Sequence, residues 1–332
     1  MLLIGVPVMV LLLAVGPLLL PEYRDPTIGR VDMHSAAFSL AAVLLVICGV
    51  KQFALANAYP LALAAIAAGL AFGVLFVRRH QSLAEPVIDV RPFRGRAFSA
   101  ALIAYALVTL AAFGIFFFLG QYLQLVKQLS PLAAGFATLP AFIGFIIGSF
   151  TTPALARRFA PGAVMIGGLA LAVVGFTLIG EARVSTPMPV IAAAMFIYTS
   201  GLSPVFTLAT ELIVGAAAAL SETSSELGGA LGIALLGSFG TAIYRTTVAR
   251  QMPSGVPTQL AAGARSTIGG AIEAANRLSA RDNAALSSAA RQAFTHAMNI
   301  TAWLCVAILI ATAIGLWFAL HPLREGRRIH EL

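Results

Sequence analysis

Charged side chains are scarce in this chain of 332 residues. Asp, Glu, Lys and Arg together make up 10% of it, hydrophobic residues make up 59%, and the mean hydropathy is +0.92. A soluble globular domain carries about 25% charged residues, so the composition predicts a protein of the lipid bilayer. The formal charge of +8 is also compatible with nucleic acid. However, the arginines lie in short loops between apolar runs, which is typical of membrane topology, and we expect no nucleic-acid partner.

Cysteine is equally rare, and the familiar catalytic motifs are missing. Cys48 and Cys305 both lie in apolar runs, which excludes a disulfide framework and favours buried thiols. The five histidines show no metal-like spacing. The sequence contains no Walker motif, nucleophile elbow or zinc motif, so it supports neither ATP-driven transport nor hydrolysis. We therefore expect no enzyme activity, no cofactor and no bound metal.

Long apolar runs fill the rest of the sequence. A membrane helix needs about 20 mostly apolar residues, and nine runs free of Asp, Glu, Lys and Arg have about that length. They predict an all-α, polytopic fold with about nine transmembrane helices, of which the eighth begins earlier than its run, near Ala217. The runs are Met1–Pro21, Met33–Val50, Gln52–Val77, Ala97–Val126, Gln128–Ala156, Phe159–Gly180, Val184–Thr210, Leu227–Tyr244 and Gln292–Leu323.

The distribution of basic residues predicts the orientation of these helices. If the first span ends in the cytoplasm, only Lys51, Lys127 and Arg183 fall in the short outside loops. Twelve arginines then lie inside: Arg24, Arg30, Arg78, Arg79, Arg91, Arg94, Arg96, Arg157, Arg158, Arg324, Arg327 and Arg328. This bias follows the positive-inside rule and places the C-terminus in the cytoplasm.

A long polar segment, residues 246–291, interrupts the apolar pattern before the last span. We expect two short surface helices there, Thr258–Arg277 and Asn283–Phe294, with Asp282 as the N-cap of the second. A solvated external cap is the simplest role for this loop, and ligand binding is the alternative.

Two acids lie at the start of a glycine-rich apolar helix, in the stretch from Ser221 to Gly240. Glu222 and Glu226 are four residues apart, which places both carboxyl groups on one face. An ionisable group at membrane depth is costly and usually faces a wet interior path. These acids therefore indicate a transport pathway. The alternative is that they cap the helix at its cytoplasmic end or interact with its positive dipole there.

Other polar, aromatic and small residues have two open interpretations each. Gln121, Tyr122 and Gln124 either line a substrate cavity or tie helices together. Phe117 and Phe145 either offer cation–π surface to a lipophilic cation or meet lipid and neighbouring helices. The pairs of small residues four apart predict close helix packing; they are Gly144 with Gly148 and Gly228 with Gly232.

Several ordered segments resemble one transporter family. The segments Gln121-Tyr-Leu-Gln124, Ser130-Pro-Leu-Ala-Ala-Gly135 and Leu139-Pro140 resemble the start of the C-terminal half of fourteen-helix drug:proton antiporters. These antiporters are the EmrB/QacA type of the major facilitator superfamily. The run Ile4-Gly-Val-Pro-Val-Met-Val10 resembles that family's sixth helix, and Ser221 to Gly240 resembles its thirteenth.

The resemblance implies a division of the chain. Residues 1–21 match helix six, residues 22–97 hold two linker helices, and residues 98–323 form the six-helix C-terminal half. A basic cytoplasmic tail, residues 324–332, follows, and about five helices of the family are absent at the start. A facilitator half is built from two inverted three-helix repeats.

The resemblance also implies a function. It predicts efflux of hydrophobic or cationic drugs across the plasma (inner) membrane, driven by the proton gradient without a cofactor. Glu226 and Glu222 are then the proton-coupling residues, because an acid in a low-dielectric cavity can load and release a proton near neutral pH. The family subgroup with an acid in helix ten differs here, since Phe145 stands at that place. The segment before Ser221 is also shorter than is usual in the family.

Three hypotheses for the whole chain stay open. It is a truncated form of such an exporter, a membrane remnant that does not transport, or a half-transporter that pairs with a separate N-terminal half. Alternating access requires two halves that rock about a central site, so we expect no transport by this chain alone.

Overall fold

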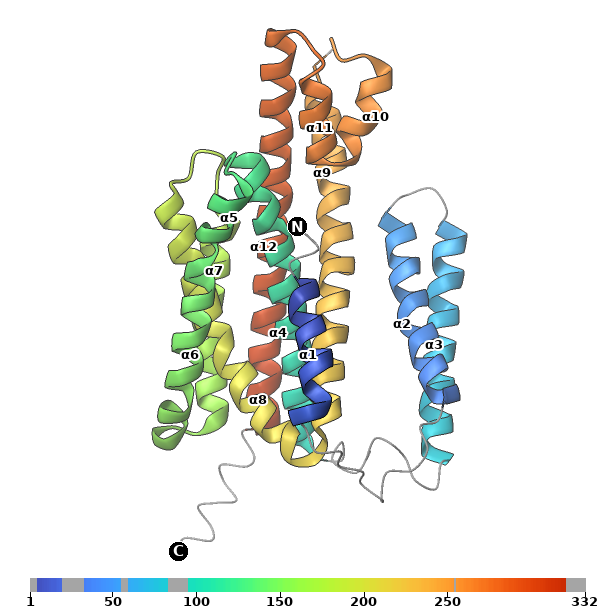
Figure 1. Ribbon diagram of the computed structural model, residues 1–332, viewed down its shortest axis with the longest axis vertical. Coiled ribbons are helices and arrows are strands. Elements are labelled where there is room, and N and C mark those ends of the chain that lie inside the picture. The colour runs from blue at the N-terminus through green and yellow to red at the C-terminus, as the bar shows by residue number, and fades with distance from the viewer. Residues whose placement is uncertain (1–4, 20–32, 55–58, 83–94, 254, 321–332) are drawn as a thin grey trace, which may run out of the picture.

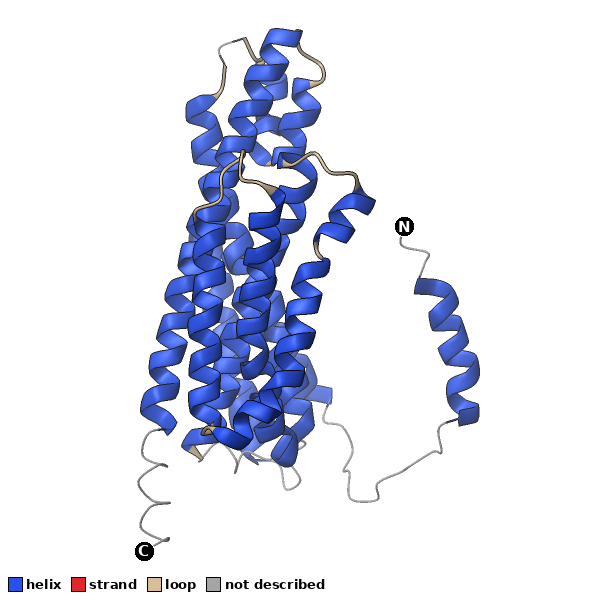
Figure 2. Ribbon diagram, turned by 90° about the vertical axis from the view of Figure 1, so that its left-hand side faces the viewer, coloured by secondary structure: helices blue, strands red, loops and turns tan. Residues whose placement is uncertain are grey.

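The structure is a computed structural model that describes residues 5–19, 33–54, 59–82, 95–253 and 255–320. Every regular element within these ranges is helical, as Figures 1 and 2 show. Eight of the described stretches are long and apolar enough to cross a membrane. The prediction of an all-α, polytopic membrane protein is therefore confirmed. The predicted basic tail, residues 324–332, lies outside the described residues.

The first three helices are α1 (Gly5–Leu19), α2 (Met33–Ala54) and α3 (Tyr59–Ser82). The described part of α1 has 15 residues, fewer than a span needs, so eight rather than nine spans are found among the described residues. Helices α2 and α3 form a hairpin (Figure 1), in which a Cβ at Gly49 would lie 2.8 Å from the Ala62 carbonyl oxygen. A missing side chain thus lets the two backbones approach closely.

The remaining helices form one bundle. It consists of α4 (Arg96–Gln121) with its π-helical end η3 (Tyr122–Val126), α5 (Pro131–Ala137), α6 (Leu139–Arg158), α7 (Pro161–Gly180), α8 (Met188–Leu231), the π-helix η4 (Gly232–Leu236), α9 (Gly237–Gln251), α10 (Thr258–Ser266), α11 (Ile268–Ala275) and α12 (Ala280–Leu320). Helix α5 begins where the sequence has a cap followed by proline, because Ser130 Oγ accepts a hydrogen bond from the Ala133 N–H at 3.2 Å.

Helix α8 covers most of the seventh predicted span and the beginning of the eighth, which continues through η4 into α9. Its backbone is helical throughout and bends at the lower end in Figure 1. The first part packs on α7, where a Cβ at Gly201 would lie 2.6 Å from the Gly168 carbonyl oxygen. The second part packs on α4 through Gly228. The side chains of residues 212–221, where the shortened segment was expected, lie outside the described residues.

The expectation for the polar loop was wrong in three details. The first predicted surface helix is two helices, because Thr267 is extended and its hydroxyl oxygen accepts from the Gly270 N–H at 3.0 Å to start α11. The second is not separate but is the beginning of α12, which runs on into the last span. The N-cap residue of that helix is Ser279 rather than Asp282, since Ser279 Oγ accepts a hydrogen bond from the Asp282 N–H at 3.3 Å.

Helix α12 is much longer than a membrane is thick. Its 41 residues extend over about 62 Å, whereas the hydrocarbon core is about 30 Å. Its first part therefore projects together with α10, α11 and the end of α9, at the top of Figure 1. We call this group the cap. The Tyr244 hydroxyl on α9 donates to the Ala264 carbonyl at 2.9 Å and fastens the cap to the bundle.

Candidate functional site

The two predicted coupling acids lie on an exposed face. Glu222 and Glu226 are both exposed on the last turns of α8, where the span that ends at Gln251 begins. At 100° per residue their side chains point about 40° apart, and the exposed Ala230 and Ile233 continue the same face. Within the described part of the chain, neither carboxylate forms an ion pair. The structure thus offers two neighbouring, unneutralised acids, which we call the acid face.

Glycines on the opposite side of the same helix hold it against α4. A Cβ at Gly228 would lie 2.7 Å from the Ala106 carbonyl oxygen, and one at Gly232 would lie 2.9 Å from Leu110 Cα. The facing atoms are backbone, which cannot rotate away. Glu226 is two residues from Gly228, so close packing behind the helix turns the acid face away from α4.

The other predicted glycine pair lies between α6 and α8. A Cβ at Gly148 would be 2.7 Å from the Ser200 carbonyl oxygen, and one at Gly144 would be 2.6 Å from Thr199 Oγ1. The Ser200 hydroxyl donates to the Gly144 carbonyl at 3.0 Å. Such small-residue contacts with an interhelical hydrogen bond are how membrane helices associate.

Three aromatic rings form a row across α4, α8 and α6. Tyr105 and Phe206 meet edge to face with ring centroids 5.2 Å apart, and Phe206 meets Phe145 in the same way at 5.6 Å. Phe145 is 38% exposed, so the row reaches the surface of the bundle. We call it the aromatic row. The sequence pointed to Phe145 but missed Tyr105 and Phe206, because nothing local indicates that distant helices bring these rings together.

The acid face, on α8, and the aromatic row both lie at the level of the half of α4 that begins at Arg96. Tyr105 is about 14 Å along the helix from Arg96, and Gly228 packs beside it at Ala106. Glu226 precedes Gly228 by half a turn, so the acids lie between the level of Tyr105 and the Arg96 end. An unneutralised carboxylate and exposed π surface are two groups that attract an apolar cation.

The other predicted cavity residues lie elsewhere. Phe117 is 40% exposed and packs edge to face on Phe118, with ring centroids 5.5 Å apart. Gln124 is exposed, and the Gln121 side-chain amide reaches only its own helix, the Phe117 carbonyl at 3.5 Å. These residues are near η3, the far end of α4 from Arg96, so the structure does not join them to the aromatic row.

Tyr122 forms a hydrogen bond of the kind that ties helices together. It is fully buried, and its hydroxyl donates to the Arg183 carbonyl at 2.7 Å, in the segment between α7 and α8. The neighbouring Lys127 Nζ donates to the Val184 carbonyl at 2.6 Å and to the Thr186 carbonyl at 2.5 Å. On α12, the Asn299 amide donates to the Ala182 carbonyl at 2.9 Å. Burial lowers the pKa of Lys127.

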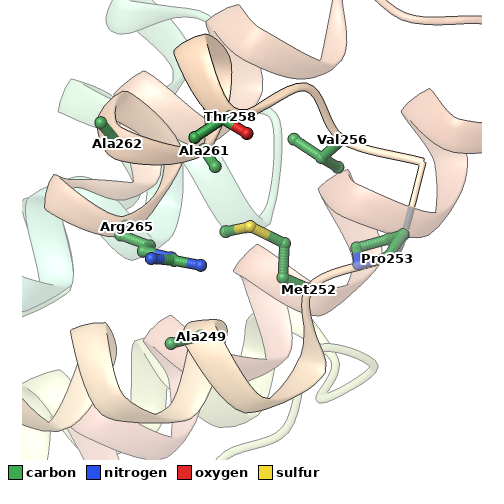
Figure 3. Close-up of a pocket in the computed structure, with 8 residues that line it drawn as sticks. All are labelled: Ala249, Met252, Pro253, Val256, Thr258, Ala261, Ala262 and Arg265. Atoms are coloured by element: carbon green, nitrogen blue, oxygen red, sulfur yellow. The ribbon is translucent and has the colours of Figure 1, made fainter.

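A cavity of about 340 Å³ opens within the cap, between the end of α9 and α10 (Figure 3). Its lining is apolar apart from Thr258 and Arg265, and in Figure 3 the guanidinium of Arg265 points toward Met252. The cavity belongs to the cap and not to the acid face or the aromatic row. The described residues contain no group of three or more His, Cys, Asp or Glu side chains that could hold a metal ion.

Comparison with known proteins identifies transport proteins as relatives. No family model matches the chain. It is 36% identical over 319 residues to the multidrug efflux pump LfrA of Mycolicibacterium smegmatis, which covers 94% of this chain and 63% of LfrA. It is 26% identical over 330 residues to the methyl viologen resistance protein SmvA of Salmonella typhimurium, covering 96% and 66%. The tetracenomycin C resistance and export protein of Streptomyces glaucescens is 27% identical over 265 residues, covering 76% and 49%.

These relatives indicate the class of protein that the chain resembles. It is similar to multidrug efflux and resistance pumps over nearly its whole length. The names of all three describe efflux, export or resistance and none describes catalysis, which agrees with the prediction that the chain is not an enzyme. The chain spans less than two thirds of the length of LfrA.

Proposed function

We propose that this chain is the larger part of a drug efflux transporter of the major facilitator type, with the EmrB/QacA group as the specific family. The observation that carries the proposal is the 36% identity to a multidrug efflux pump over 94% of the chain. The substrates we propose are hydrophobic or cationic compounds, taken up from the bilayer of the inner membrane. The C-terminus then lies in the cytoplasm, as the arginine distribution predicts.

We propose that the proton gradient drives export through Glu226, with Glu222 beside it. Both acids are exposed, without an ion pair to a described residue, and lie in the same half of the bundle as the aromatic row. A protonated carboxyl would release an apolar cation, and a deprotonated one would attract it, which exchanges one for the other. No cofactor takes part in this scheme.

We further propose that a separate helical segment completes the transporter. The chain spans 63% of LfrA, and the acid face and the aromatic row both reach the surface of the described bundle. A second half that covers these surfaces would enclose them in a central site between two rocking halves. The competing candidate is a membrane remnant that does not transport.

The experiment is efflux of the lipophilic cation tetraphenylphosphonium from membrane vesicles under an imposed pH gradient. The chain is produced alone and together with the part of LfrA that it does not match. We expect efflux only from the pair, and absence of efflux from both preparations, with the chain well expressed, would favour the remnant.

Variants of the active pair test the residues. We expect Glu226→Gln to reduce gradient-driven efflux about tenfold or more, because a neutral amide cannot exchange a proton. Glu273→Gln is the matched control, since Glu273 is an exposed acid in the cap that pairs with Arg277 at 2.7 Å. Phe206→Ala should weaken binding of the cation about two- to thirtyfold. Undiminished efflux by Glu226→Gln would refute the coupling role.

A further inference from the structure

A second cavity, of about 310 Å³, lies where the cap meets the segments that join the membrane helices. We call it the junction cavity. Two of its lining residues, Val184 and Ala284, are apolar. The other six have side chains that can form hydrogen bonds. One comes from the segment that follows η3 and five come from α12: Gln128, Asn283, Ser287, Ser288, Arg291 and Gln292. None of the eight is acidic.

Arg291 is the cation of the junction cavity. Its Nε–H donates to the Leu125 carbonyl of η3 at 3.3 Å. With the Gln128 amide oriented to satisfy both groups, its oxygen accepts from Nη1 at 2.7 Å and from Nη2 at 2.9 Å. A guanidinium has five N–H groups, so two stay available. The lining offers this charge no carboxylate, so its acceptors here are neutral oxygens.

The neighbouring side chains add further donors. The Ser287 hydroxyl donates to Asn283 Oδ1 at 3.3 Å, which leaves the amide N–H groups of Asn283 as the donors that it can offer to a ligand. The Gln292 amide donates to Ser288 Oγ at 3.2 Å, and the Ser288 hydroxyl keeps its own hydrogen as a donor. A guanidinium, an amide and a hydroxyl thus share one small cavity. An acceptor-rich ligand is what such a set of donors can satisfy.

Cations outnumber acids around the cavity. Lys127 precedes Gln128, and Arg183 precedes Val184, so two more cations border the lining. The ammonium of Lys127 is occupied by two backbone carbonyls rather than by an acid. The carboxylate of Asp282 lies next to Asn283 in sequence and accepts from the Ser279 hydroxyl at 2.8 Å. The second nearby acid, Glu181, is exposed.

We propose that the junction cavity binds a phosphate-type oxyanion. A free N–H group of Arg291 can donate a charge-assisted hydrogen bond to one phosphate oxygen, and the Ser288 hydroxyl and the Asn283 amide supply donors for the remaining oxygens. The volume is at the lower end of the range for small-molecule sites, which suits a phosphate with a small organic group. This binding is independent of the proposed efflux.

The position of the cavity allows two sources of that phosphate. It lies beyond Val126 and before Met188, where one span ends and another begins, which is the depth of phospholipid headgroups. The ligand is therefore either a headgroup phosphate or a soluble phosphate compound. Because Arg291 also holds the Leu125 carbonyl, a bound anion would reinforce the connection between α12 and η3.

The test uses the purified full chain and its thermal stability. In detergent, inorganic phosphate is titrated against chloride at equal ionic strength. In vesicles, phosphatidylcholine alone is compared with phosphatidylcholine mixed with phosphatidylglycerol. Saturable stabilisation by phosphate in detergent indicates a soluble ligand, and stabilisation only by phosphatidylglycerol indicates a headgroup. If neither exceeds its reference, the proposal is wrong.

Variants locate the binding. Arg291→Gln should weaken the response about tenfold or more, because a charge-assisted pair is lost. If this variant fails to fold, the double change Asn283→Ala with Ser288→Ala decides, since it leaves the bond to Leu125 intact and should also weaken binding about tenfold. Arg281→Gln removes the same charge from an exposed position ten residues earlier on α12. An equal loss in Arg281→Gln would show general charge attraction and overturn the proposal.

Discussion

The contact of Gly228 with α4 gives a sharp prediction about stability. An added Cβ would lie 2.7 Å from the Ala106 carbonyl oxygen and 3.1 Å from Thr109 Cβ, so α8 must move away from α4. Overpacking of this kind costs about 1–3 kcal/mol, and the gain in helix propensity from Gly to Ala is about 1 kcal/mol. We therefore expect Gly228→Ala to lower the free energy of unfolding by about 0–2 kcal/mol. The larger, β-branched side chain of Gly228→Val should cost about 2–3 kcal/mol.

The matched control is Gly167 on α7, where an added Cβ would meet nothing within 4 Å. We expect Gly167→Ala to be neutral or slightly stabilising, because only helix propensity changes. The assay is unfolding of the purified chain in mixed micelles with increasing denaturing detergent, followed by tryptophan fluorescence. Gly167→Val serves in the same way as the control for Gly228→Val. If Gly228→Val unfolds at the same midpoint as Gly167→Val, the close approach of α8 and α4 is not what holds the acid face in place.

Two further changes test the contacts at the end of α4. Tyr122→Phe should lower the free energy of unfolding by about 1–3 kcal/mol in the same assay, because the Arg183 carbonyl loses its hydrogen-bond donor. Tyr105→Phe is the control, since it keeps its ring contact, and an equal effect of both changes would contradict this prediction. Because burial lowers the pKa of Lys127 from 10.5, the unfolded chain binds more protons than the folded one between the lowered pKa and 10.5. Stability should therefore rise with pH in that window, and melting temperatures of Lys127→Met should lack this rise; identical pH slopes would refute the assignment.

The apolar runs predicted the membrane spans well, and the polar loop poorly. A span is set by about 20 apolar residues against a fixed bilayer thickness, so the runs Ala97–Val126 and Phe159–Gly180 closely match helices in the structure. The loop has no such constraint. Ser279 and Asp282 are both good caps, and the choice between them depends on where the backbone turns. The continuity of α12 is equally hidden, since its polar first part is stabilised by packing against α11 rather than by the bilayer.

The candidate site likewise has a part that local sequence predicts and a part that depends on tertiary packing. Spacing along one helix is enough to place Glu222 and Glu226 on a common face, and the glycines two to ten residues later predict which side packs closely. The aromatic row depends instead on three helices that are distant in sequence. Phe206 follows Pro204, a buried residue against which a Cβ at Gly168 would lie at 2.9 Å, so the packing of α7 on α8 fixes where Phe206 can point. Its ring then reaches Tyr105 on one side and Phe145 on the other. The acids can be recognised in the sequence because their spacing is a local pattern. The aromatic row forms only through tertiary packing, so the sequence pointed to only one of its three rings.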